Sequence, residues 1–174
     1  MVLDALRLIL FPILMIYAAI SDTMTMTISN RVSLIVGVGF VVMAAFTGMS
    51  MSAFLWHIVA GIVVLAIAFG MFARGWIGGG DAKLAAATAL WFGFDALLPY
   101  AVYASLLGGV LTFLFIQMRI WPLPQVLQSQ GWLARLWQKQ VGIPYGIALA
   151  AAALIVYPMT PWMRAIDPAR PVLR

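Results

Sequence analysis

Long apolar runs separated by short polar segments constrain this chain more than any other feature. The run 53–73 is long enough to cross a hydrocarbon core of ~30 Å at a helical rise of ~1.5 Å per residue. Hydrophobic residues make up 65% of the chain and charged residues 9%, whereas soluble domains are about half apolar and a quarter charged. The sequence therefore predicts an integral membrane protein.

The pattern of these runs predicts an all-α, polytopic bundle of about six transmembrane helices. The fourth run covers only roughly 20 Å as a helix, which is less than the membrane core requires. Part of the glycine-rich segment before it must therefore dip into the membrane, where irregular backbone has to be shielded by protein or line a wet cavity. The six expected spans are residues 8–20, 32–47, 53–73, 82–94, 97–118 and 143–163.

We expect one membrane-embedded domain over residues 1–174. The longest polar segment contains an amphipathic stretch at about 125–140, which is typical of a helix lying in the membrane interface. The first apolar run has an alternative interpretation as a secretory signal peptide, because Ala18 and Ala19 resemble a cleavage site. The many later spans favour a single uncleaved chain.

Composition also limits the chemistry. There is no cysteine, which excludes disulfides, thiol catalysis and cysteine-ligated metals. One histidine and no glutamate argue against a zinc hydrolase site, and we expect neither a metal nor a cofactor. The net charge of +5 comes from scattered basic residues that form no cluster of the kind that binds nucleic acid.

The most unusual stretch is residues 74–84, where four glycines and an aspartate lie between two apolar runs. Gly78 and Gly80 lack a Cβ, so another backbone can approach closely. Asp81 opens the next helical run, where a carboxylate can accept hydrogen bonds from free N–H groups. A helix cap is therefore one interpretation of Asp81, and an active carboxylate is the other.

A second aspartate, Asp22, lies in the polar segment 21–31, which we expect to be a loop. Two spans separate it from Asp81, so both acids face the same compartment. The connections on that side carry most of the basic residues, which places this side in the cytoplasm by the positive-inside rule. The C-terminal arginines weigh the other way. The basic residues on the aspartate side are Arg31, Arg74, Lys83, Arg119, Arg135 and Lys139.

Two neighbouring carboxylates cannot both ionise easily, and such a pair shares a proton. One carboxylate can then deprotonate water while the other hydrogen-bonds the scissile carbonyl, which is the chemistry of aspartic proteases. An ion-coupled transporter with membrane-depth aspartates is an alternative function. A non-catalytic assembly factor of a pilus or secretion system is another.

The sequence resembles the type IV prepilin peptidases in three ordered motifs. Residues 78–84, Gly-Gly-Gly-Asp-Ala-Lys-Leu, match their GxGDxK signature, and Asp22 followed by residues 28–30, Ile-Ser-Asn, is similar to their first-aspartate motif. Residues 141–146, Val-Gly-Ile-Pro-Tyr-Gly, resemble the element that begins their last helix. Ser29 stands where the family usually has proline.

The resemblance implies a membrane aspartic endopeptidase in the bacterial inner membrane, with Asp22 and Asp81 as the catalytic pair. It implies a prepilin substrate with a short basic leader, cleaved after a glycine at the cytoplasmic face, and the pilus assembly machinery as a further partner. The chain is similar to the short members that serve Flp-type tight-adherence pili, for which N-methyltransferase activity is not expected. Residues expected to shape the site are Gly78, Gly80, Lys83, Asn30, Pro144, Tyr145 and Gly146.

Overall fold

A computed structural model describes residues 2–124, 126 and 129–166, and these residues contain helices and no strand. The predicted all-α class is confirmed. The elements in chain order are α1 (Val2–Thr25), α2 (Asn30–Phe46), α3 (Met51–Ala73), α4 (Gly79–Phe92), α5 (Leu97–Met118), α6 (Gly131–Trp137), α7 (Gly146–Val156), the 3-10 turn η2 (Tyr157–Met159) and α8 (Pro161–Arg164).

Among the described residues, three helices are long and apolar enough to cross a membrane: α1, α3 and α5. The helix α2 and the segment Gly146–Met159 are apolar but shorter, and α4 has only 14 residues. The chain therefore has the apolar helices of a membrane protein, while the number of six spans stays a prediction.

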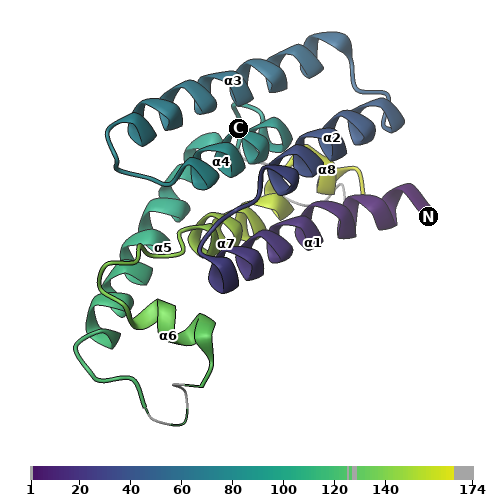
Figure 1. The fold of residues 1–174 in the computed structure, drawn as a ribbon. Helices are drawn as coiled ribbons and strands as arrows, with labels where there is room; N and C mark the ends of the chain where they lie inside the picture. Colours follow the sequence, from purple (N-terminus) through teal and green to yellow (C-terminus); the bar gives the residue numbers. More distant parts are fainter. Residues whose placement is uncertain (1, 125, 127–128, 167–174) are drawn as a thin grey trace.

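The helix α4 lies at the centre of the fold, where it packs against α2, α3 and α7. The helix α1 packs on α2 and α7, and α5 packs mainly on α7. Figure 1 shows α3 as an outer helix above α4, with α5 diverging toward α6 at the opposite end from the N-terminus. Grooves can therefore form beside α3, because its main neighbour is α4.

An aromatic cluster holds the bundle together away from α6. The indole N–H of Trp91 donates to Val36 O at 2.9 Å, and that of Trp162 donates to Trp91 O at 2.6 Å. Burial of these rings removes a large apolar area from solvent or lipid while both polar N–H groups stay paired. His57 joins the cluster, and its Nδ1 lies 2.7 Å from Leu90 O, so this ring nitrogen has a hydrogen-bond partner.

The segment 21–31 is not the loop that the sequence predicted, because α1 continues to Thr25. Thr23 Oγ1 donates to Ala19 O at 2.7 Å and Thr25 Oγ1 to Ser21 O at 2.8 Å. These side chains satisfy their hydroxyl groups on carbonyls one turn earlier, which lets a polar segment remain helical. Asp22 therefore lies on a helix.

The boundaries of three other segments also differ from expectation. The helix α4 begins at Gly79 rather than after Asp81, because the Asp81 carboxylate caps its first turn. The last apolar run is divided into α7, η2 and α8, with prolines at the start of the last two elements. The interfacial segment 125–140 contains α6, while residues 125 and 127–128, and the tail residues 167–174 with Arg170 and Arg174, lie outside the described residues.

Contact between α3 and α4 depends on Gly61, where a Cβ would collide with the Leu90 side chain. We predict that Gly61→Val lowers the free energy of unfolding by roughly 1–3 kcal/mol, as overpacking does. Gly70→Val on the same helix is the control, because a Cβ there meets nothing within 4 Å. Thermal unfolding in detergent measures both, and equal melting temperatures would contradict the prediction.

Candidate active site

The carboxylate of Asp22 is buried between α1 and the start of α7. Asp22 is only 5% exposed. Its Oδ2 accepts a 2.7 Å hydrogen bond from the Gly146 backbone N–H. That N–H belongs to the first residue of α7, so the carboxylate also meets the positive end of a helix dipole. A buried carboxylate requires such a donor, because an unpaired one is costly.

The turn after α1 is formed by Met26, whose φ is +56°. Its N–H donates to Asp22 O at 2.7 Å and closes the helix with a left-handed residue. Methionine takes this conformation at a cost, and such residues cluster at functional sites. The turn directs the chain back, so that Ser29 can cap α2 by accepting from Arg31 N–H at 3.3 Å.

Asp81 is the third residue of α4 and partly buried. Its Oδ2 accepts a 3.2 Å hydrogen bond from the Gly78 N–H, which ties the carboxylate to the residue before the helix. Asp81 is therefore not the N-cap that the sequence suggested, because that position is Gly78, but its carboxylate accepts from the N–H of that residue. This bond does not exclude an active carboxylate, because it uses only one of the two carboxylate oxygens.

Ile28 brings the two aspartates together. A Cβ on Gly80 would lie 3.0 Å from Ile28 Cβ and 3.2 Å from its backbone N and O, and a Cβ on Gly146 would lie 2.9 Å from Ile28 Cδ1. The starts of α4 and α7 therefore both press against Ile28, which only glycine allows. Ile28 is therefore a shared neighbour of Gly80, which precedes Asp81, and of Gly146, which donates to Asp22.

Lys83 and Asn30 meet each other rather than the carboxylates. Lys83 Nζ donates to Asn30 Oδ1 at 2.7 Å, and both residues are exposed. Asn30 is the first residue of α2, so this bond links the starts of α2 and α4. Lys83 is among the residues expected to shape the site, and its geometry is that of a side chain that anchors a helix start.

Pro144 and Tyr145 place α7 against α5. Pro144 is fully buried, and the Tyr145 hydroxyl lies 2.6 Å from Thr112 Oγ1. The Tyr145 ring also rests on α5 at Gly108, where a Cβ would come within 3.2 Å of it. These contacts fix the segment whose next residue, Gly146, donates to Asp22.

Two arginines connect segments at the end of the fold that contains α6. The sequence had indicated only that these residues mark the cytoplasmic side of the membrane. Arg119 Nε donates to Leu136 O and its Nη2 donates to Gly142 O, both at 2.8 Å. Arg135 Nη2 donates to Met24 O at 3.2 Å, near the end of α1. No spacing in the sequence indicated these contacts, because each joins separate segments through a backbone carbonyl.

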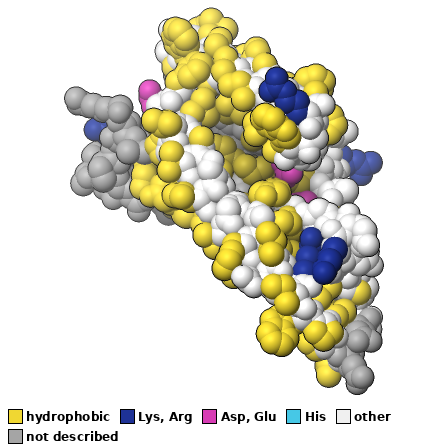
Figure 2. Space-filling view, turned by 90° about the vertical axis from the view of Figure 1, so that its left-hand side faces the viewer, with side chains coloured by type: hydrophobic (Ala, Val, Ile, Leu, Met, Phe, Trp, Pro, Cys, Tyr) yellow, Lys and Arg dark blue, Asp and Glu magenta, His cyan; other side chains and the backbone are white. Residues whose placement is uncertain are grey.

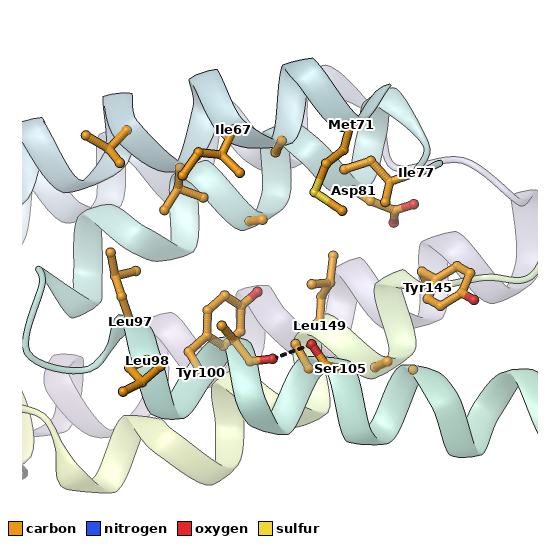
Figure 3. A pocket seen from close by; sticks show the side chains of 18 of the residues that line it. Ile67, Met71, Ile77, Asp81, Leu97, Leu98, Tyr100, Ser105, Tyr145 and Leu149 are labelled. Carbon is orange, nitrogen blue, oxygen red and sulfur yellow. Dashed lines mark hydrogen bonds between the residues drawn. The ribbon is translucent and has the colours of Figure 1, made fainter. Parts of the chain in front are cut away.

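A groove of about 690 Å³ runs between α3 and α4 on one side and α5 and α7 on the other. We call it the α3–α5 groove. Figure 2 shows the hollow in a mainly apolar surface, with acidic side chains visible inside it. In Figure 3, Asp81 lies at one end of its wall, facing the α5 and α7 side chains across the opening. Its walls include Ile67, Met71, Ile77, Tyr100, Ser105, Tyr145 and Leu149.

The groove contains a hydroxyl that the sequence analysis missed. Tyr100 is 4% exposed and lines the groove, and its side chain points toward the opening in Figure 3. Ser105 also lines the groove, but its hydroxyl donates to Ala101 O at 2.7 Å. Among the described residues, no three His, Asp or Glu side chains gather as metal ligands. Asp81 is the carboxylate among the described residues that line the groove.

Residues 9–113 match the type IV leader peptidase family, so the match covers more than half of the chain and the protein belongs to that family. Members of this family are aspartic-type prepilin peptidases. The matched region contains both aspartates and the Lys83–Asn30 pair, and it ends before Gly146. Comparisons with curated proteins and with solved structures give no match.

The role of the Gly146 N–H in positioning Asp22 can be tested by adding one methyl group at Gly146. In Gly146→Ala the new Cβ would lie 2.7 Å from Asp22 Oδ2 and 2.9 Å from its Cβ, so the carboxylate must move. We predict a loss of peptidase activity of about a hundredfold, the typical cost of a 1 Å misplacement. Gly142→Ala is the control, because a Cβ there meets nothing within 4 Å. Equal activity of the two variants would show that the position of Asp22 does not depend on Gly146.

Proposed function

We propose that this protein is a membrane aspartic endopeptidase that removes the leader peptide of type IV prepilins. The observation that supports this most directly is the approach of Asp22 and Asp81, from two family motifs, beside an apolar groove. Each carboxylate has one oxygen held by a backbone N–H. The other oxygen of each makes no hydrogen bond within the described part of the chain and is available to water or substrate.

The proposed reaction is hydrolysis through a shared proton. One carboxylate takes a proton from water as the water oxygen attacks the scissile carbonyl carbon, and the other, in its protonated form, donates to the carbonyl oxygen. Collapse of the tetrahedral species breaks the C–N bond, and the departing amine takes up a proton from the pair. The backbone N–H groups of Gly78 and Gly146 keep one oxygen of each carboxylate oriented throughout.

The α3–α5 groove is the proposed site of the apolar helix that follows the cleaved bond. Its lining is almost entirely hydrophobic, and Asp81 lies at one end of the wall. A helix entering laterally from the membrane would bury its side chains against α3 and α5 while its start reaches the aspartates. Because this helix would arrive from lipid, close van der Waals packing rather than the hydrophobic effect would stabilise it in the groove.

We infer six spans with the aspartates toward the cytoplasm, in the bacterial inner membrane. The charged groups Arg135 and Lys83 lie beside the ends of helices that carry the aspartates, which supports a basic face on this side. The similarity of the motifs to short family members suggests a Flp-type prepilin, cleaved after a glycine, as the substrate. The pilus assembly machinery is then a partner, and N-methylation is not expected.

We predict that Asp22→Asn and Asp81→Asn each abolish leader removal, because an amide cannot hold or transfer the shared proton. Asp95→Asn is the matched control, because Asp95 is an exposed aspartate in the turn before α5. The measurement is co-expression with Flp-type prepilins, followed by gel shift, and by mass spectrometry to locate the cleaved bond.

Cleavage after glycine by wild type and by Asp95→Asn, but by neither active-site variant, would support the peptidase. Normal processing by either active-site variant would contradict the catalytic pair. If the wild type is inserted and folded but cuts no prepilin, the transporter and assembly-factor hypotheses would replace it.

The proposed binding of the substrate helix in the α3–α5 groove is tested separately, by a substitution that adds a side chain to the groove. Gly109 lines the groove, and a Cβ there meets nothing within 4 Å, so Gly109→Leu adds side-chain volume at the groove wall from an unobstructed Cβ. We predict at least a tenfold rise in KM for a membrane-embedded prepilin. Gly70→Leu places the same side chain on open space of α3 outside the groove and should leave KM unchanged. Equal KM values would show that the substrate helix binds elsewhere.

A further inference from the structure

We propose that Lys83 and Asn30 are positioning residues that hold Asp81 at its working distance from Asp22; this inference rests on the proposed peptidase function. Lys83 Nζ donates to Asn30 Oδ1 at 2.7 Å across a sequence separation of 53 residues. Asn30 begins α2, and Lys83 lies two residues after Asp81 in α4. The bond therefore joins the helix of one aspartate to the segment that follows the other.

A second contact acts beside this bond. Gly80 is packed against Ile28, so closely that a Cβ would lie 3.2 Å from the Ile28 backbone N and O. Gly80 and Lys83 thus attach the start of α4 to the segment 28–30 at two points, Ile28 and Asn30. Ser29, which lies between these two residues, caps α2. Close packing alone would let α4 slide along that segment, whereas a directional hydrogen bond resists sliding. The two contacts together fix where Asp81 lies.

The role is geometric rather than electrostatic. The Asp81 carboxylate accepts from the Gly78 N–H, whereas Lys83 extends toward Asn30. Within the described residues, Lys83 forms no ion pair with a carboxylate. Loss of the Lys83 donor should therefore disturb the alignment of the two aspartates and leave the charges around them as they were.

The experiment measures kcat and KM for a cleaved prepilin across pH. Lys83→Met keeps the length of the side chain and removes the donor, and we expect kcat to fall by about a hundredfold, the usual cost of a small misplacement, with KM within about twofold. Lys83→Arg should restore most of kcat. The pH midpoints of kcat should stay in place. Arg74→Met is the control, because it removes a nearby cation that packs on Trp76, and it should behave as wild type.

Asn30 provides an independent pair of variants in case Lys83→Met does not fold. Asn30→Asp keeps an acceptor for Lys83 and should retain kcat, whereas Asn30→Leu has similar volume and should lose it. Because residues acting through one bond are not additive, Lys83→Met combined with Asn30→Leu should be no worse than either alone.

Three results would overturn the proposal. A rise in KM with unchanged kcat would assign Lys83 to substrate binding, and a shifted pH midpoint would assign it an electrostatic role. Equal kcat in Asn30→Asp and Asn30→Leu would show that the bond does not matter. All of these require a wild-type enzyme that cleaves prepilin, so the failure of this inference leaves the proposed function intact.

Discussion

The hydrogen bond from the Gly146 N–H to Asp22 Oδ2 is the interaction on which the arrangement of the site depends. A carboxylate buried in an apolar bundle is costly unless donors face it, and here the donor is the start of the last long helix. The bond spans 124 residues of sequence, so it can form only when α7 has packed against α1. The hydroxyl of Tyr145 contacts Thr112 on α5, and Arg119 donates to Gly142 O in the segment before α7. Both contacts hold the start of α7 in place. The site is therefore assembled by tertiary packing.

One end of the fold is densely packed with aromatic side chains, and the other end contains the α3–α5 groove. Away from α6, the aromatic rings around Trp91 are buried and their N–H groups are paired, which gives α1, α2, α4 and α8 a common anchor. Toward the aspartates, α3 and α5 each rely mainly on one neighbouring helix, and the α3–α5 groove opens between them. The densely packed aromatic core and the open groove therefore lie in different parts of the fold.

Near each of the two aspartates, a glycine lets a helix start pack closely against Ile28. Gly80 and Gly146 both touch Ile28, so a single buried side chain separates the starts of α4 and α7. The sequence predicted that another backbone can approach Gly78 and Gly80. In the structure the backbone close to Gly80 is that of Ile28, while Gly78 donates its N–H to Asp81.

The sequence by itself determined the membrane class, the helical fold and the two candidate carboxylates, because apolar runs and a rare acid next to glycines are local properties. It did not determine that α1 continues past Asp22, since threonine hydroxyls bonded to earlier carbonyls override the polar pattern. It also gave no sign of the Lys83–Asn30 bond, the arginine contacts or the groove. Those depend on which helices become neighbours, and that choice is made by side-chain packing between segments far apart in the chain. Only the tertiary structure, which presses Gly80 and Gly146 onto Ile28, decided that the segment before Asp81 and the donor to Asp22 share one neighbour.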